Sequence, residues 1–446
     1  MRLGKHFAVA FLMLIFLVAT AVAQENAELT GVVTDPNGAI IPNASVSLTL
    51  QASGEARHNA TDTAGIYTFS NLRVGNYTLT VTSPGFQTYS KTDIVINVAS
   101  TTRDDVHLTV GSNTQTVTVE ANALQLQSET NEISDLITGK QVTELATNGR
   151  NVTQLAVLGL GVSNNIPSFN GINALTAGTG ISFDGTRPGH NVYMIDGSEV
   201  YDRGCGGCFT ILPSLDALSE FKTLDSNYSP DYGVASGGTI TMVVKSGTSA
   251  LHGGLWEFNR NDAFDANNYI SNLEAQPKPE LRLNIFGGNV GGPLTIPHLY
   301  NTDRKRTFFF VNEEWRRLVT GTNPTVTPTV PASDFPTAGQ PLVYTPPANG
   351  ITPVVPATSD PAKLQLYAMD GLVPGSPFPN NTIPTNLIDP NAVLFMGTGA
   401  IPKPNASNGS NSFITSLKQP TNVREDLVRI DHTINDKLTL MGHYIH

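Results

Sequence analysis

The sequence predicts a mainly β protein of several domains that is exported from the cytoplasm. Short segments of alternating apolar and polar residues recur between turns rich in Gly, Asn and Pro, as in β-sandwiches and β-barrels. Only 14% of the 446 residues are charged, whereas soluble domains average about 25%. The net charge of −11 argues against a nucleic-acid partner, because phosphate binding requires a basic surface.

Residues 1–23 have the composition of a secretory signal peptide. Arg2 and Lys5 precede the apolar run Phe7–Val18, and Ala21-Val22-Ala23 provides small residues for cleavage before residue 24. The apolar run is too short to span a bilayer, which takes about 20 residues. Later segments also lack a candidate membrane helix, so any membrane insertion would have to use strands closed into a barrel.

Residues 25–110 predict a small β-sandwich of six or seven strands. Val46, Leu48 and Leu50 alternate with polar residues, which indicates a strand with one buried face. Asp35-Pro36-Asn37-Gly38 has the residues that a tight turn requires.

Gly31–Asp35, Gly65–Phe69 and Gly75–Tyr77 give this region a family resemblance. It resembles the carboxypeptidase regulatory-like domain, a prealbumin-like β-sandwich. The resemblance implies a rigid, non-catalytic adaptor, with carbohydrate binding as an alternative role. None of the His residues begins a His-x-x-Glu motif, the ligand spacing of a zinc peptidase.

Residues 112–248 begin with the alternating segment Thr116–Ala121. One interpretation is a last strand of the sandwich. The other is an exposed strand that adds to the sheet edge of a partner. The segment resembles the TonB box, through which outer-membrane receptors engage the energy-transducing protein TonB. The candidate box residues are Val117, Thr118, Val119, Glu120 and Ala121.

The rest of this region is similar to the α+β plug domain of TonB-dependent receptors, in particular the Oar-like subgroup. The segments that carry the similarity are Leu145–Asn151, Asp184–Gly189, Asn191–Gly197, Ser219–Lys222, Tyr228–Gly233 and Gly237–Thr248. Within them, Arg150, Arg187 and Asp196 are candidates for a functional role. They either line a substrate path through the plug or hold the plug to the barrel wall through polar pairs.

Cys205 and Cys208 are the only cysteines, and in an exported protein they favour a local disulfide. A zinc site would need two further ligands, and no paired His lies nearby. No nucleophile elbow, His-Glu-x-x-His or Walker loop occurs. The sequence therefore predicts no catalytic residue, no metal site and no cofactor.

Residues 249–446 resemble the start of an Oar-like transmembrane β-barrel, most clearly at His252–Asp262 and Phe286–Pro293. The alternation of Leu281, Leu283 and Ile285 with polar residues predicts a wall between lipid and a wet lumen. Asn435-Asp436 predicts a hairpin turn. An aromatic girdle is predicted from Phe308, Phe309, Phe310 and Trp315.

Residues 319–420 hold 18 of the 29 prolines, a density that strands do not tolerate. We expect a long extracellular loop that either meets ligand or is mobile and has no binding role. A plugged receptor barrel needs about 22 strands, and the remaining residues suffice for about five to eight strands of about 9 to 11 residues. The incomplete barrel predicts that this chain is the N-terminal part of a longer receptor.

The resemblance implies a TonB-dependent receptor in the bacterial outer membrane that transports a bulky substrate. Its implied partners are TonB with ExbB and ExbD, outer-membrane lipid, and an extracellular siderophore, oligosaccharide, peptide or protein. Two alternatives stay open: a secreted carbohydrate-binding β-protein and a surface adhesin without transport. The adhesin should keep its function when Thr116–Ala121 is deleted.

Overall fold

The computed structural model describes residues 27–112, 116–120, 129–164, 180–202, 204, 208–232, 236–274, 276–322, 324–346, 352–406 and 410–446. For residues 116–120, 148 and 208 it describes the backbone alone. The predicted signal peptide lies outside this set. Within these ranges, no helix is both long and apolar enough to cross a membrane. The chain divides into a main unit and a loop unit, the latter comprising residues 259–283 and 317–421.

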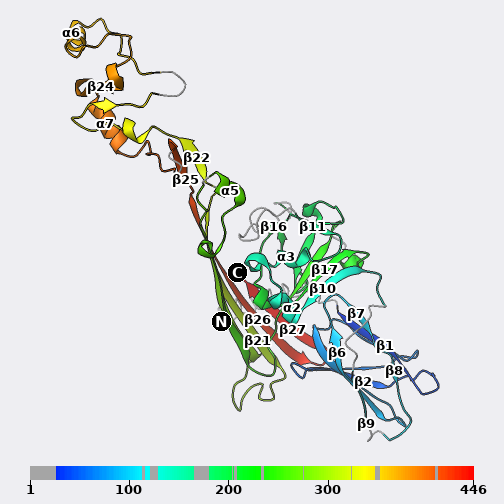
Figure 1. Ribbon diagram of the computed structural model, residues 1–446. Helices are drawn as coiled ribbons and strands as arrows, with labels where there is room; N and C mark the ends of the chain where they lie inside the picture. The colour runs from blue at the N-terminus through cyan, green and yellow to red at the C-terminus, as the bar shows by residue number, and fades with distance from the viewer. Residues whose placement is uncertain are drawn as a thin grey trace, which may run out of the picture. The chain divides into compact units, whose positions relative to one another are not determined.

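The first nine strands form the predicted N-terminal sandwich (Figure 1, blue). One sheet has the order β4-β1-β7, with β8 also on β1, and the other has the order β3-β2-β5-β6-β9. The strands are β1 (Glu28–Thr34), β2 (Ser45–Leu50), β3 (Ala56–Ala60), β4 (Ile66–Phe69), β5 (Gly75–Thr82), β6 (Thr88–Ile96), β7 (Thr101–Arg103), β8 (Val106–His107) and β9 (Thr116–Glu120).

The sandwich core follows the alternation of its sequence. Val46 and Leu48 on β2 and Leu79 on β5 are fully buried in one apolar cluster. The turn before β2 is confirmed, because the Asp35 carboxylate accepts hydrogen bonds from the backbone N–H groups of Asn37 and Ala39, both at 2.8 Å. Such a side-chain acceptor holds the turn and thereby the register of the strands.

The region predicted as the plug, which we call the plug below, has an α+β structure around a five-stranded sheet of order β10-β17-β18-β13-β14. Every residue of β18 is buried, so the sheet is covered on both faces. The elements are β10 (Ile133–Thr138), α2 (Gly139–Glu144), α3 (Thr153–Ala156), β11 (Val162–Asn164), β12 (Ile181–Phe183), β13 (Val192–Ile195), β14 (Ser198–Glu199), β15 (Tyr201–Asp202), β16 (Cys208–Phe209), β17 (Leu218–Ser226) and β18 (Thr239–Val244).

Five long strands form the wall, in the order β19-β20-β21-β26-β27 (Figure 1). They are β19 (His252–Asn261), β20 (Leu281–Pro293), β21 (Thr307–Gly321), β26 (Lys418–Asn435) and β27 (Leu438–Ile445). The predicted hairpin forms, but Asn435 pairs with Leu438 as the last strand residues, so the turn is Asp436-Lys437.

The side chains of the wall face differently from our expectation. Leu283 and Ile285 are buried, although we expected apolar residues to face lipid. Phe308 and Phe310 are also fully buried, and Phe310 packs in the core cluster of the plug. They are therefore not part of an aromatic girdle. The physical reason is that a plug fills the space inside the wall, so both faces of a wall strand need apolar side chains.

The outer face of the wall is apolar as well. Trp315 stacks on Phe286 with ring centres 5.5 Å apart, which fits the predicted girdle. Large apolar side chains are exposed along β19, β20, β26 and β27, namely Leu255, Val290, Val428, Ile430, Leu438, Leu440 and Tyr444. An exposed apolar band of this kind suits contact with lipid.

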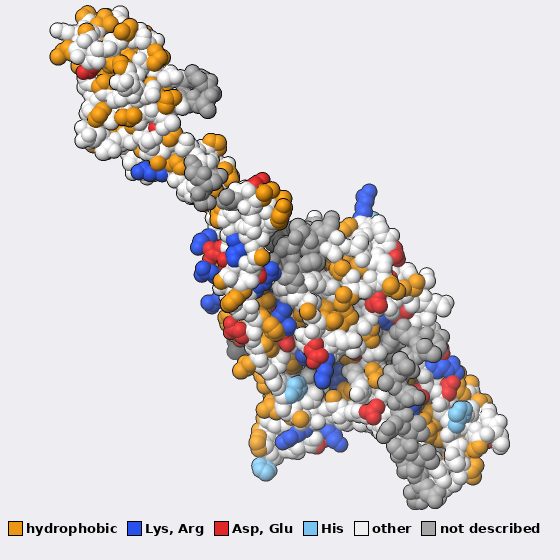
Figure 2. Space-filling view, in the orientation of Figure 1, with side chains coloured by type: hydrophobic (Ala, Val, Ile, Leu, Met, Phe, Trp, Pro, Cys, Tyr) orange, Lys and Arg blue, Asp and Glu red, His pale blue; other side chains and the backbone are white. Residues whose placement is uncertain are grey.

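The Pro-rich region is more ordered than we expected of a loop. Its small core contains Tyr344, Val355 and Tyr367. Figure 2 shows mainly apolar and uncharged side chains around α6 and α7. The elements of the loop unit, apart from the wall strands, are α5 (Tyr269–Leu273), β22 (Thr325–Pro328), β23 (Leu342–Val343), α6 (Pro361–Met369), β24 (Thr382–Ile383), α7 (Pro390–Gly397) and β25 (Ser412–Thr415). Proline density excludes long strands here but not a compact fold, because Pro opens both α6 and α7.

Candidate functional site

The three predicted plug residues lie in different surroundings. Arg150 is buried and pairs with Asp216 at 2.5 Å, and its guanidinium carbon lies 4.0 Å from the ring centre of Phe258 on wall strand β19. Asp196 is 1% exposed. Arg187 is exposed, and its carbonyl accepts a hydrogen bond from the backbone of the nearby 3-10 turn. The structure therefore does not bring the three together into one site.

Wall strand β21 holds the plug segment that contains Arg150. The Arg316 guanidinium donates to the carbonyl of Gly149 at 3.3 Å and to that of Arg150 at 3.0 Å. The neighbouring wall residue Glu314 pairs with Arg316 at 2.9 Å and accepts a hydrogen bond from the Ser214 hydroxyl of the plug at 2.8 Å. Charged side chains of the wall thus bind both backbone and side chain of the plug.

The charges around Arg150 compensate one another. Burial raises the pKa of Asp216, while Arg150 and Lys245 act in the opposite direction. Burial lowers the pKa of Lys245, and Asp216 counteracts that shift. The Lys245 ammonium also donates to the Asp216 carbonyl at 2.8 Å. These three residues act as one local group of paired charges.

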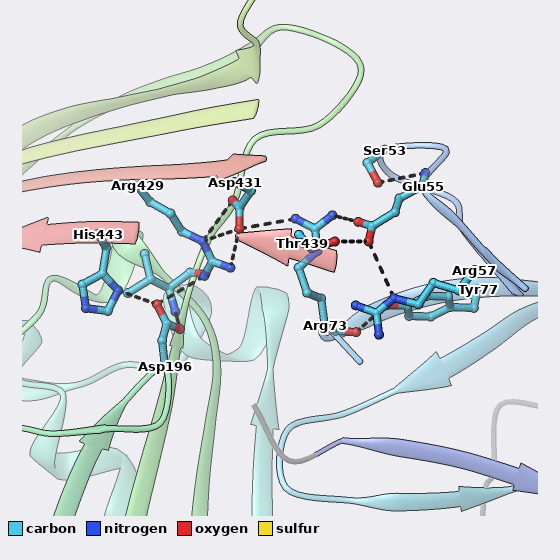
Figure 3. Close-up of polar contacts among 11 residues, drawn as sticks. Ser53, Glu55, Arg57, Arg73, Tyr77, Asp196, Arg429, Asp431, Thr439 and His443 are labelled. Atoms are coloured by element: carbon cyan, nitrogen blue, oxygen red, sulfur yellow. Dashed lines mark hydrogen bonds and ion pairs between the residues drawn. The ribbon is translucent and has the colours of Figure 1, made fainter. Parts of the chain in front are cut away.

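Asp196 is the plug end of a second, larger network (Figure 3). It lies in an Asp-Gly turn after β13, with φ of +47°. Its Oδ1 accepts from the backbone N–H of Val244 at 3.0 Å. Its Oδ2 lies 3.3 Å from Arg429 Nη1 and 2.9 Å from His443 Nδ1, both on the wall.

Arg429 connects Asp196 to Asp431, its neighbour on the same face of β26. Arg429 is 2% exposed and Asp431 is 1% exposed. Their closest atoms, Arg429 Nη2 and Asp431 Oδ1, are 3.0 Å apart, and Arg429 also donates to the Val244 carbonyl at 2.8 Å. A buried guanidinium needs its charge balanced, and Arg429 pairs with both carboxylates.

The same network continues into the sandwich (Figure 3). Arg73 Nη1 lies 3.4 Å from Asp431 Oδ1, and Arg73 also pairs with Glu55. The Thr439 hydroxyl of β27 donates to Glu55 at 2.9 Å. Burial lowers the pKa of Arg73, but Glu55 and Asp431 outweigh burial and raise it. Arg73 therefore stays charged.

A second contact joins the sandwich to plug strand β17. The Glu220 carboxylate accepts from the backbone N–H of Val98 at 2.7 Å. The fully buried Lys222 donates to the Ala99 carbonyl at 2.6 Å and pairs with Glu132 at 2.5 Å. Glu220 and Lys222 belong to the segment Ser219–Lys222 that carried the plug resemblance.

The TonB-box candidate forms strand β9, parallel to β6, with Val117 opposite Tyr89. The backbone thus corresponds to our first interpretation, a last strand of the sandwich sheet. Ala121 lies outside the described residues, and the side chains of Val117, Thr118, Val119 and Glu120 are not described. The proposed disulfide falls outside as well, since Cys205 is not described and Cys208 only by its backbone.

The contacts described above join structural parts and do not form a reaction centre. No group of three or more His, Cys, Asp or Glu in the described part of the chain could hold a metal ion. Buried ion pairs and side-chain-to-backbone hydrogen bonds fix the sandwich, plug and wall to one another.

Sequence reasoning identified Arg150 and Asp196 but missed most of the other residues in the contacts between sandwich, plug and wall. The missed residues are Glu55, Arg73, Glu132, Asp216, Glu220, Lys222, Arg316, Arg429, Asp431 and His443. One signal was present, because Arg429 and Asp431 alternate with apolar residues on β26 and so mark a charged inner face of the wall. The plug partners of Arg429 lie more than 180 residues away in the chain, so the sequence around Arg429 does not reveal them.

Comparison with known proteins agrees with this architecture. Residues 28–109 match the family model of the carboxypeptidase regulatory-like domain, and residues 243–446 match that of the outer membrane beta barrel domain. The TonB-dependent transporter Oar of Myxococcus xanthus is 23% identical over 261 residues, which cover 54% of this chain. Two parts of the chain thus match known domain families, and the chain is similar to a TonB-dependent transporter.

The matched part spans 22% of the length of the Oar transporter. Two solved structures are also similar. The outer membrane transporter YddB from Escherichia coli has a TM-score of 0.38 and 10% identity, over 68% of this chain and 31% of that one. A ferric enterobactin receptor (PfeA) mutant from Pseudomonas aeruginosa has a TM-score of 0.34 and 13% identity, over 70% and 32%. The match to the outer membrane beta barrel domain places this chain in the outer membrane.

Proposed function

We propose that this receptor transports a bulky ligand across the outer membrane and that TonB supplies the force. In this proposal a ligand binds from outside, TonB pulls on Thr116–Ala121, and the plug rearranges within the wall. ExbB and ExbD pass the energy of the inner-membrane proton gradient to TonB. The plug contacts of Arg150 and Asp196 are the ones that must yield when the plug moves.

The observation that carries the proposal is the position of β9. It is the last strand of its sheet, and an edge strand offers unpaired N–H and C=O groups to an incoming strand. No described strand pairs with its outer edge. A strand of TonB could therefore pair with β9 without first opening the sandwich core.

The loop unit supports a role in ligand contact. Several large apolar side chains on and near α6 and α7 are exposed, including Met369 at 80% and Leu394 at 71%. Exposed apolar surface on a compact fold is typical of a binding surface. We keep three ligand classes, siderophore, oligosaccharide, and peptide or protein, because no contact among the described residues distinguishes them.

An uptake assay in cells that produce the full receptor tests the proposal. Labelled ferric siderophores, oligosaccharides and peptides are offered to wild-type cells and to cells whose receptor lacks Thr116–Ala121. We expect one class to accumulate inside wild-type cells and to remain at the surface in the deletion variant. An outer-membrane immunoblot checks that both receptors are present at equal amounts.

Two results would overturn the proposal. Equal accumulation in both strains would show that transport does not need the segment. Equal surface binding with no accumulation in either strain would favour the adhesin alternative.

A further inference from the structure

The sandwich contacts the plug and the wall at the same time. Val98 and Ala99 bind plug strand β17 through Glu220 and Lys222. On the other side, Arg73 reaches Asp431 of the wall. The sandwich therefore bridges the two parts that must separate when the plug rearranges.

The polar contacts between sandwich and plug are backed by an apolar one. Val98 and Ala99 are buried in a cluster with Leu224 of β17 and Val243 of β18. Their removal from the plug would expose this cluster to water, which is unfavourable in proportion to the apolar area. The docked position is thus stabilised by both apolar burial and charge.

The ionic contacts form one continuous chain of alternating sign across the three parts (Figure 3). From plug to sandwich it runs from Asp196 to Arg429, then to Asp431, Arg73 and Glu55. Asp431 is shared, because Arg429 and Arg73 both pair with it. A change at the sandwich end therefore acts on the ion pair that holds the plug.

Undocking of the sandwich would weaken the pair between Arg429 and Asp196 in two ways. It removes Arg73 from Asp431, so that Asp431 competes more strongly with Asp196 for Arg429. It also admits water, which weakens every ion pair by raising the local dielectric constant. A cavity of about 260 Å³ already lies beside Arg73 and Arg429, so solvent has a route to the pair.

We propose that the N-terminal sandwich is a clamp that holds the plug in the wall, and that its undocking releases the plug contact at Asp196. This inference goes beyond the proposed function, because it concerns what holds the plug in place; it rests on the proposed function only for the pull on β9. Strand β9 belongs to the same sandwich sheet. A pull on β9 would then act on the clamp before it reaches the plug.

Hydrogen exchange of the full receptor in lipid nanodiscs, read by mass spectrometry, tests the clamp. The variant Arg73→Gln removes the charge that faces Asp431. We expect exchange to rise about tenfold or more both in the sandwich segment Val98–Ser100 and in plug strands β13 and β18, since loss of one partner from a buried pair is strongly destabilising.

Arg57→Gln is the matched control. Arg57 also lies beside Glu55, at 3.7 Å, but its other described hydrogen bonds go to the carbonyls of Ser70 and Asn71 inside the sandwich. We expect its exchange at β13 and β18 to equal that of wild type. Asp431→Asn breaks the same series of ion pairs on the wall side and leaves every sandwich residue unchanged. It therefore controls for misfolding of the sandwich in Arg73→Gln.

The expected result is that Arg73→Gln and Asp431→Asn raise exchange in both places and Arg57→Gln in neither. The clamp is refuted if Arg73→Gln frees the sandwich while plug exchange stays at the wild-type rate. It is also refuted if neither Arg73→Gln nor Asp431→Asn changes exchange in the sandwich segment.

Discussion

Replacing Asp196 by Ala should loosen the plug more than any other single change in a plug turn. Asp196 accepts one backbone hydrogen bond and pairs with Arg429 and His443. Loss of one partner from a buried ion pair costs about 3–5 kcal/mol, because the other charge remains buried. Ala in the left-handed conformation, here at φ of +47°, costs about 1 kcal/mol more.

Asp196→Asn removes the charge of the side chain but keeps the turn. Asn tolerates positive φ and its amide oxygen can still accept from the backbone of Val244, so only the charge is lost. We expect the plug to lose about 1.5–3 kcal/mol of stability, which is the usual contribution of a hydrogen bond to a charged group. Since about 1.4 kcal/mol corresponds to tenfold, exchange of β18 amides should rise by about three to four orders of magnitude in Asp196→Ala and by about one or two in Asp196→Asn.

Asp184→Ala provides the matched control for this prediction. Asp184 also lies in an Asp-Gly turn of the plug with φ of +48°, but it is exposed. We expect Asp184→Ala to lose only about 1 kcal/mol of stability, which is what Ala costs in the left-handed conformation. Hydrogen exchange of the three variants in the full receptor would refute the reasoning if Asp196→Ala and Asp184→Ala behaved alike.

Two further predictions concern the plug and the sandwich. Burial, aided by the charge of Asp135, raises the pKa of Asp225 to about 6, so the folded plug holds a proton that the unfolded chain has lost, and stability falls as pH rises from about 4 to about 6. Asp225→Asn should therefore stabilise the plug by about 1 kcal/mol at neutral pH and not at about pH 4, as measured by urea unfolding; an equal gain at both pH values would contradict this. Gly31→Ala should lower the melting temperature of the sandwich by several degrees, since a Cβ there would lie 1.9 Å from the Asp104 carbonyl oxygen, and overpacking costs about 1–3 kcal/mol. Gly442→Ala, with open space around it, should leave calorimetry unchanged, and equal shifts in the two variants would disprove the account.

The two Asp-Gly turns show where prediction from sequence stops. Both turns follow from local chemistry, because Asp and Gly tolerate positive φ. Whether such an Asp anchors the plug depends on a partner far along the chain. Asp196 meets Arg429 on β26, whereas Asp184 meets solvent, and nothing in the neighbouring residues distinguishes them.

The wall strands show a second limit. Alternation on β20 correctly predicted a strand, since a period of two is enough for that. It could not assign the faces, because the plug makes the inner face apolar at Phe310 and the lipid makes the outer face apolar at Trp315. The Pro-rich region shows a third limit: its proline density argued against long strands, but it did not reveal short helices or a core around Tyr344 and Tyr367.

The central claim, that TonB acts on this receptor through β9, is tested most directly by disulfide cross-linking in cells. Val117→Cys is introduced into the full receptor in a Cys205→Ser/Cys208→Ser background, with Thr102→Cys on β7 as the control, and paired with cysteine variants of TonB. The account predicts a receptor–TonB product at Val117 and none at Thr102. Absence of a product at Val117, with the receptor present in the outer membrane, would contradict it.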